Sequence, residues 1–360
     1  IETLYEVLHD AHRMRRWRIG RPEPLRGFTD SMVRDFHRNW YTPSNTILAV
    51  VGDVDVEAVR AMVAETYAAH AARDPMPAPG PHEPARRDAR YRALTGEVEQ
   101  SHVAIGWRTV GPLHPDCAAL DVAASLLATG RASRLYREVR ERGLATSASA
   151  YHYTPTQLGV FALSVVAPDD RLADGVRAAW CALRRLATDG PTDDELARVR
   201  SVLRARRLHA SETMEGQAEE LVAWEALGGQ DVGEQYHAAV EAVTAADVRR
   251  VLAAWCDPTA LACVSYRPDG AAPLAMDGDA LVAWLEAART DAATIERRVP
   301  VAPARVVAAP VHERTEDDVS VFRTAAGVSV LVQRKIGAPV VHLGAFVQGG
   351  PCDEAPDQAG

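Results

Sequence analysis

Residues 126–150 read LLATGRASRLYREVRERGLATSASA, and this stretch carries the most structural information in the chain. Leu127, Leu135 and Val139 recur on one side of an expected helix and are predicted to face a core. Gly143 is expected to end that helix, because glycine readily adopts the left-handed backbone found at helix ends. Small residues follow it, and they predict a strand.

The arginines of this stretch have two interpretations. Arg134, Arg137, Arg140 and Arg142 line the outer sides of the expected helix, where positive charge near a helix end complements the helix dipole. Alternatively, one of them projects over a peptide groove, since a guanidinium can hold a carbonyl or carboxylate through two hydrogen bonds. The residues alone leave both readings open.

Working outward, the surrounding pattern alternates between strands and helices. Thr192 and Glu195 form a capping box, in which each side chain satisfies a backbone N–H at a helix start. Such clustering predicts an α+β fold, a largely antiparallel sheet with helices on one face. The expected strands span residues 102–109, 145–153 and 159–167, and the expected helices span residues 116–142 and 170–188.

Two distant segments repeat the same order of elements. A helix from Thr29 to Trp40 precedes the expected strand 46–51, and a helix from Thr244 to Trp255 precedes the expected strand 261–266. A constant shift of 215 aligns them without a gap and predicts tandem duplicated domains. The aligned identities are Thr29 with Thr244, Val33 with Val248, Arg34 with Arg249, Trp40 with Trp255 and Pro43 with Pro258.

Two further segments extend this pattern. After Gly52, a second helix is expected with Asp55 as its N-cap. A weaker echo relates residues 101–111 to 339–349, both strand-like and both turning at glycine. The C-terminal segment is therefore expected to open another copy of the domain.

The composition restricts the class of protein. A chain of 360 residues, at roughly 150 residues per domain, predicts two or three domains. The formal net charge of −9 argues against a surface that follows nucleic-acid phosphates. No apolar run reaches the roughly 20 residues that span a bilayer, so no membrane span is expected. The five scattered cysteines, including Cys117, are predicted to be small buried side chains.

No complete active site is visible in the sequence. It contains neither HExxH nor HxxEH, no GxSxG and no GxxxxGK[ST]. His9 and His12 form an HxxH pair on an expected helix. The pair has two interpretations: the histidines are metal ligands, or they are polar residues at a helix end. His82 and Glu83 lie in a proline-rich stretch and are expected to be solvated.

An ordered set of motifs resembles the insulinase and pitrilysin family. These are zinc metallopeptidases with an inverted HxxEH motif, and they include the mitochondrial processing peptidases. Residues 130–150 resemble the family's GxxSRLYxxLRExxGLAYSVxA stretch, and residues 192–200 its TxxELxxxK helix start. Residues 36–55 resemble FYxxxYxPxNxxLxVxGDVD, residues 12–20 resemble HPxxxPxxG, and residues 325–350 resemble the NGLxVxV opening of each half.

The resemblance implies duplicated metallopeptidase-like domains that close around an unfolded peptide. Zinc is expected in the complete protein, with its HxxEH ligands outside this chain. The implied partners are a peptide or unfolded protein substrate and either the other half of the same polypeptide or a homologous subunit, with no nucleic acid. The implied boundaries are residues 1–73 for the end of the first domain, 74–90 for a proline-rich linker, 91–268 for a complete second domain, 269–310 for a helix and linker, and 311–360 for the start of a third domain.

The resemblance also suggests one substrate-binding residue. The family places an arginine and a tyrosine of this motif near the reacting carbonyl, and these positions fall on Arg140 and Thr146. A threonine hydroxyl reaches less far than a phenol, so the usual pair is incomplete here. The alternative function is therefore a noncatalytic family member that serves as a scaffold or partner subunit. In either case the segment alone is expected neither to bind stoichiometric zinc nor to cleave peptides.

Overall fold

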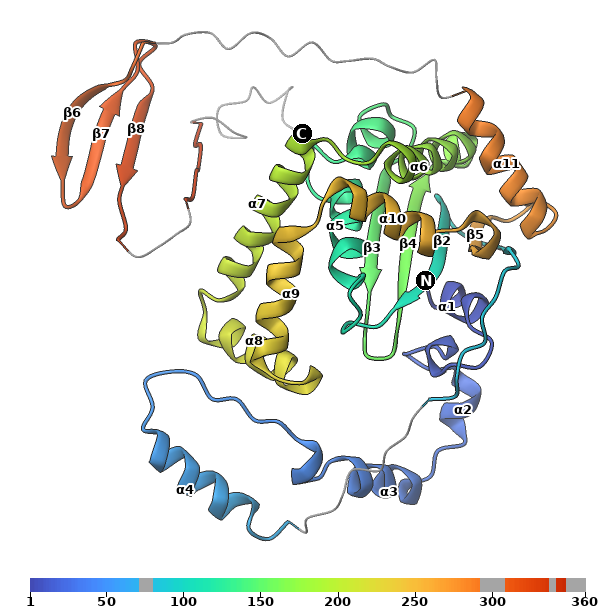
Figure 1. Ribbon diagram of the computed structural model, residues 1–360, viewed down its shortest axis with the longest axis horizontal. Helices are drawn as coiled ribbons and strands as arrows, with labels where there is room; N and C mark the ends of the chain where they lie inside the picture. The colour runs from blue at the N-terminus through green and yellow to red at the C-terminus, as the bar shows by residue number, and fades with distance from the viewer. Residues whose placement is uncertain (71–79, 292–307, 337–340, 348–360) are drawn as a thin grey trace, which may run out of the picture. The chain divides into compact units, whose positions relative to one another are not determined.

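A computed structural model describes residues 1–70, 80–291, 308–336 and 341–347 (Figure 1). The chain divides into two compact units, residues 1–296 and 297–360. The first unit combines one five-stranded sheet with helices, and the second contains a three-stranded sheet. The predicted α+β fold class is confirmed.

The sheet of the first unit has the strand order β1-β5-β2-β4-β3. Strand β2 pairs antiparallel with both β5 and β4, β4 pairs antiparallel with β3, and only β1 and β5 are parallel. The mainly antiparallel sheet predicted from the sequence is therefore confirmed. The strands are β1 Arg90–Gly96, β2 Ser101–Val110, β3 Ser147–Tyr153, β4 Leu158–Ala167 and β5 Ala262–Pro268.

A layer of helices that includes α5, α6 and α10 covers one face of the sheet (Figure 1). Helices α5, α6 and α10 pack directly on the strands, and α7 and α9 pack against α5. The helices are α1 Glu2–Leu8, α2 Pro22–Arg26, α3 Asp30–Trp40, α4 Val56–Tyr67, α5 Cys117–Ala128, α6 Asp169–Asp189, α7 Asp193–Ala210, α8 Met214–Leu227, α9 Gln230–Ala242, α10 Ala245–Trp255 and α11 Gly278–Asp291.

Successive side chains of a strand point to opposite faces of the sheet, so the strands contribute to two separate hydrophobic cores. On the main face, Ile105 and Trp107 of β2 join Phe161 of β4 beneath the helices. On the opposite face, Val160 and Val264 pack with α1. The sheet is thus covered on both faces where α1 lies, which explains why its central strands read as nearly continuous apolar runs.

Helix α1 approaches the sheet closely because β2 has a glycine at the contact. A Cβ atom placed on Gly106 would lie 3.0 Å from Cδ2 of Leu4 and 3.1 Å from Cδ1 of Leu8. Both leucines are fully buried. A side chain at this position would require the two leucine side chains to shift.

The prediction of one continuous helix over residues 116–142 is wrong, because the helix is interrupted in its middle. Helix α5 ends at Ala128, and Gly130 adopts a left-handed φ of 78°. The chain then forms a π-helical turn over Tyr136–Arg140, and Gly143, with φ of 68°, ends it as predicted. The glycine interrupts the helix because its backbone reverses direction there, although the apolar periodicity continues across the break.

The two segments related by the shift of 215 share a threonine N-cap and the turn that follows the helix. Thr29 caps α3 by accepting from the backbone N–H of Met32, and Thr244 caps α10 by accepting from that of Asp247. Each helix ends at tryptophan, and a 3₁₀ turn that begins with proline follows. The structural match therefore extends from the cap to the turn.

The strand predicted at residues 46–51 is wrong. No strand among the described residues pairs with this segment, and Ile47, Leu48 and Val50 are exposed. Its counterpart β5 lies between β1 and β2, which satisfy its backbone groups. A strand pattern becomes a strand only where a neighbouring chain completes the hydrogen-bond ladder.

The prediction that Glu83 is solvated is also wrong. Its carboxylate accepts hydrogen bonds from the backbone N–H groups of Asp10, Ala11 and His12 at 2.7, 3.0 and 2.6 Å. Arg108 of β2 pairs with the same carboxylate at 2.7 Å, and the side chain of Glu83 is only 4% exposed. The carboxylate thereby joins the stretch that leads into β1 to the end of α1.

Glu83→Gln is expected to lower the free energy of unfolding at pH 7 by about 2 kcal/mol, the range for hydrogen bonds to a charged group. Burial opposes ionisation, yet the three backbone hydrogen bonds leave the pKa of Glu83 below its ordinary value. A lowered pKa contributes stability above about pH 4.3, the ordinary glutamate value, and that stability is lost as the pH falls through the folded-state pKa.

Urea unfolding at pH 7 and at pH 3 measures both effects. The wild-type chain should lose more stability between these values than Glu83→Gln does. Glu97→Gln, at an exposed glutamate, is the matched control and should behave like the wild type. Equal stability of the two variants at pH 7 would contradict the anchoring role.

The second unit contains an antiparallel sheet with the order β6-β7-β8. Asp317 and Asp318, both with positive φ, form the two-residue turn between β6 and β7, as favoured hairpin turns require. The strand-like segment 339–349 was expected to form a further strand, but residues 341–347 form none and the others lie outside the described residues. The strands are β6 Val311–Glu316, β7 Val319–Arg323 and β8 Ser329–Gln333.

Candidate functional site

The stretch 126–150 runs from the end of α5 into β3 and presents one apolar side to the core. Leu127, Leu135 and Val139 are fully buried, as the sequence predicted. Ser133 is buried as well, next to the glycine turn. The spacing of these side chains fixes which arginines point outward.

Arg134 has a structural role. Its guanidinium donates to both carboxylate oxygens of Glu195 at 2.9 and 2.8 Å and to the carbonyl of Gly190 at 2.8 Å. Glu195 also completes the capping box with Thr192 at the start of α7, as the sequence predicted. This bidentate pair fastens the motif to the α6–α7 connection.

Arg140, the predicted substrate-binding residue, has a different environment. Its side chain is exposed, and its guanidinium carbon lies 5.4 Å from the centre of the Tyr136 ring. Within the described residues no carboxylate forms an ion pair with it. Thr146 is exposed just before β3, and its backbone N–H donates to the carbonyl of Val166 at 2.9 Å. Arg140 is available to a ligand, and its role stays a prediction.

Substitutions of Arg134 and Arg140 are expected to have different effects on the free energy of unfolding. Arg134→Ala is expected to lower the free energy of unfolding by about 2 kcal/mol, because it leaves the carboxylate of Glu195 without its partner. Arg140→Ala should change it by less than about 0.5 kcal/mol, as exposed substitutions usually do. Chemical denaturation of both variants checks this, and an equal loss would contradict the division of roles.

His9 and His12 do not converge on a shared metal position. Nδ1 of His9 donates to the backbone carbonyl of Tyr5 at 2.9 Å, and burial lowers the pKa of His9. Nε2 of His12 lies 2.8 Å from Oε1 of Gln157. In the part of the chain that the structure describes, neither histidine belongs to a group of three ligand-type side chains.

A small cavity lies beside this pair. Its volume is about 160 Å³, below the roughly 300 to 1,000 Å³ of a typical small-molecule pocket. It does not support a site for a small organic substrate. Its lining residues are Tyr5, His12, Arg13, Met14, Arg18, Tyr153, Pro155 and Thr156.

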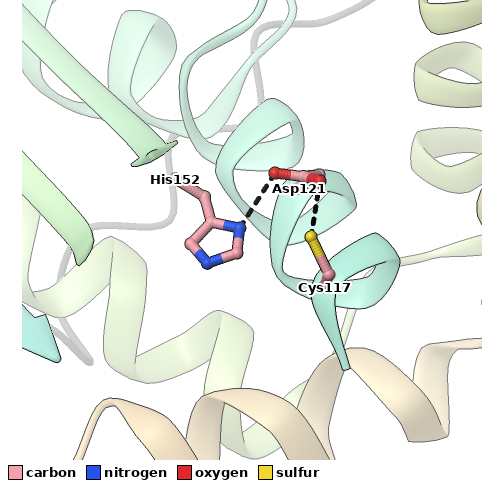
Figure 2. Close-up of side chains that lie close together, drawn as sticks. All are labelled: Cys117, Asp121 and His152. Atoms are coloured by element: carbon pink, nitrogen blue, oxygen red, sulfur yellow. Dashed lines mark hydrogen bonds and ion pairs between the residues drawn. The ribbon is translucent and has the colours of Figure 1, made fainter. Parts of the chain in front are cut away.

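A polar cluster that the sequence did not reveal lies between α5 and β3. Figure 2 shows Cys117, Asp121 and His152 with their side chains directed at one another. Nδ1 of His152 lies 2.9 Å from Oδ1 of Asp121, and the thiol of Cys117 donates to Oδ2 at 3.5 Å. Burial, with the Asp121 charge nearby, raises the pKa of the Cys117 thiol to about 12. The cluster has no sequence signature, because its members are four and thirty-one residues apart.

Residues 27–203 match the family model described as Peptidase M16 inactive domain. These residues belong to the M16 peptidase family. The resemblance inferred from the sequence motifs is confirmed, and the matched region contains both the α3 segment and the Arg140 motif.

Curated relatives of this chain are named zinc proteases. An uncharacterised zinc protease of Mycobacterium bovis is 30% identical over 202 residues, which is 55% of this chain and 46% of the relative. Zinc protease PqqE of Helicobacter pylori is 29% identical over 147 residues, 40% of this chain and 33% of the relative. The chain spans less than half the length of these relatives.

Solved structures share the fold. A protease from Helicobacter pylori superposes with a TM-score of 0.68 at 22% identity, covering 74% of this chain and 65% of that one. A peptidase M16 inactive domain from Pseudomonas fluorescens gives a TM-score of 0.66 at 20% identity, covering 76% of this chain and 66% of that one.

No helix in the described ranges has both the length and the apolar character needed to cross a bilayer.

Proposed function

We propose that this chain is part of a zinc-dependent metalloendopeptidase of the M16 family. In this proposal it forms a chamber wall and a peptide-binding surface, and the HxxEH zinc site lies outside the chain. The carrying observation is the match of residues 27–203 to a domain described as inactive, together with relatives named zinc proteases. The proposed domain boundaries are those expected from the sequence.

The residues present do not fit the family's catalytic zinc. The sequence holds no HxxEH, and the HxxH pair of His9 and His12 is engaged with Tyr5 and Gln157. No hydrolytic step is therefore assigned to this chain. Its contribution is binding and orientation of the peptide.

The edge of the sheet supplies a surface that can bind an extended peptide. Strand β3 is an edge strand, so the backbone groups on its outer side have no partner strand within the described sheet. An extended peptide adds to such an edge through main-chain hydrogen bonds, which tolerate many sequences. Arg140 precedes β3 by seven residues, Ser147 being the first residue of the strand, and its exposed guanidinium can hold a carbonyl of the added peptide.

Arg140→Ala in the complete protein is expected to reduce kcat/KM for an unstructured peptide about tenfold, the effect of losing about 1.4 kcal/mol of transition-state binding. Arg137→Ala, at an exposed arginine on the same turn, is the matched control and should leave turnover unchanged. Equal turnover in both variants would assign Arg140 to the helix end alone.

The 360-residue chain by itself is expected to cleave no peptide, with or without added zinc. A fluorogenic peptide library assayed in the presence and absence of a chelator measures this. Chelator-sensitive cleavage by a clean preparation would place catalytic ligands within the chain and overturn the proposal.

A noncatalytic role as scaffold or partner subunit is the alternative, and Thr146 favours it. The family motif has tyrosine at this position, and a threonine cannot deliver a phenol hydroxyl to the reacting carbonyl. Thr146→Tyr tests this alternative in the complete protein. An increase in peptide turnover supports an active enzyme with a weakened pair, whereas absence of cleavage in both forms supports the noncatalytic role.

A further inference from the structure

Asp121 is unusual among the carboxylates near the core. Helix α5 is apolar along nearly its whole length, and Asp121 is its one charged residue. Other carboxylates that face the packed body pair with arginine, for example Asp116 with Arg250 and Asp169 with Arg267. Within the described residues Asp121 has no arginine partner, although the chain is rich in arginine.

Its neighbours are instead groups that bind metals. Cys117 precedes Asp121 by one helical turn, so both side chains leave the same face of α5. His152 reaches them from β3 with a side chain that has no exposed surface (Figure 2). The sulfur, carboxylate oxygen and imidazole nitrogen all lie within 4.8 Å of one another.

These separations suit a single small cation. Zinc binds sulfur at about 2.3 Å and nitrogen or oxygen at about 2.0 to 2.2 Å, so tetrahedral donors lie roughly 3.5 Å apart. The observed contacts of 2.9 Å between His152 and Asp121 and 3.5 Å between Cys117 and Asp121 require only small adjustments. A thiolate, an imidazole and a carboxylate form a donor set that zinc accepts readily.

We propose that Cys117, Asp121 and His152 bind one zinc ion, in a structural site that joins α5 to β3 and is separate from the family's HxxEH site. The Tyr236 hydroxyl donates to Oδ2 of Asp121 at 2.7 Å and so helps to hold the carboxylate in place. One quarter of the Asp121 side chain is exposed, which gives an ion a route to the site.

The surrounding side chains support this assignment. The hydroxyl of Thr109 lies 2.9 Å from Nε2 of His152, the ring nitrogen that would not bind the metal. A threonine hydroxyl can donate or accept, so it holds the ring in either tautomer when Nδ1 exchanges its proton for the metal. Partners of this kind orient metal-binding histidines in proteins generally. The thiol releases one proton when the ion binds.

This proposal differs from the sequence-based expectation that the segment alone binds no stoichiometric zinc. The alternative is a buried hydrogen-bond network that needs no metal, since the same groups also bond to one another. The two differ in one observable, because only a metal site contains a bond from the Cys117 sulfur to a bound ion. Failure of this site leaves the proposed peptidase function untouched, because that function uses different ligands.

Cobalt(II) titration of the metal-stripped 360-residue chain tests for that bond. Cys352→Ser is used as the background, because Cys352 lies outside the described residues and its thiol is a competing ligand. One equivalent of cobalt should produce a thiolate-to-cobalt charge-transfer band in the near ultraviolet, and zinc should displace it. Elemental analysis after dialysis against zinc should give one ion per chain.

Cys117→Ala should abolish the band. Cys256→Ala deletes an equally buried thiol that, among the described residues, belongs to no group of three metal-binding side chains, and this variant should retain the band. Thr109→Val should weaken zinc binding about tenfold. Absence of the band in the background chain, or a band of full strength in folded Cys117→Ala, would overturn the site. If Cys117→Ala does not fold, Cys117→Ser serves for the same comparison, and the background spectrum decides by itself.

Discussion

The first unit depends on the packing of Trp107 in the middle of the sheet. Its ring is fully buried, lies parallel to that of Trp180 on α6 with 6.0 Å between centres, and lies 6.4 Å from Phe161 on β4. Its indole N–H donates to the carbonyl of Asp257 at 2.9 Å, in the turn that leads into β5. Trp107 thus links β2 to β4, to the turn before β5 and to α6, and the neighbouring Gly106 lies against α1.

The sequence predicted the elements whose signal is local. Side-chain caps predict the starts of three helices, at Thr29, Thr192 and Thr244. Apolar runs predict the buried strands β2, β4 and β5. The errors occur where structure depends on distant residues. Residues 46–51 have a strand pattern without a partner strand, and the carboxylate of Glu83 finds its amide partners more than seventy residues away. The periodicity of apolar residues along the sequence shows neither the missing partner strand nor the distant partners of Glu83.

The 130–150 motif shows how similar residues acquire different roles. Arg134 is fixed by Glu195, so its presence is explained by folding alone. Arg140 sits six residues later on an exposed turn with no ion-pair partner in the described chain, so folding does not explain it. Sequence reasoning selected Arg140 only through the family resemblance. It missed the group around Asp121 entirely, because a helix face and a strand supply its members and no spacing links them.

The docking of Glu83 on residues 10–12 has a consequence for how the chain can diverge. The hydrogen bonds of Glu83 to residues 10–12 bring together two points of the chain about seventy residues apart, so the segment between them is a closed excursion. Doubling the length of such an excursion costs only about 0.6 kcal/mol in closure entropy. Insertions and deletions between these anchor points should therefore accumulate among descendants of this gene, while the two anchors themselves vary little.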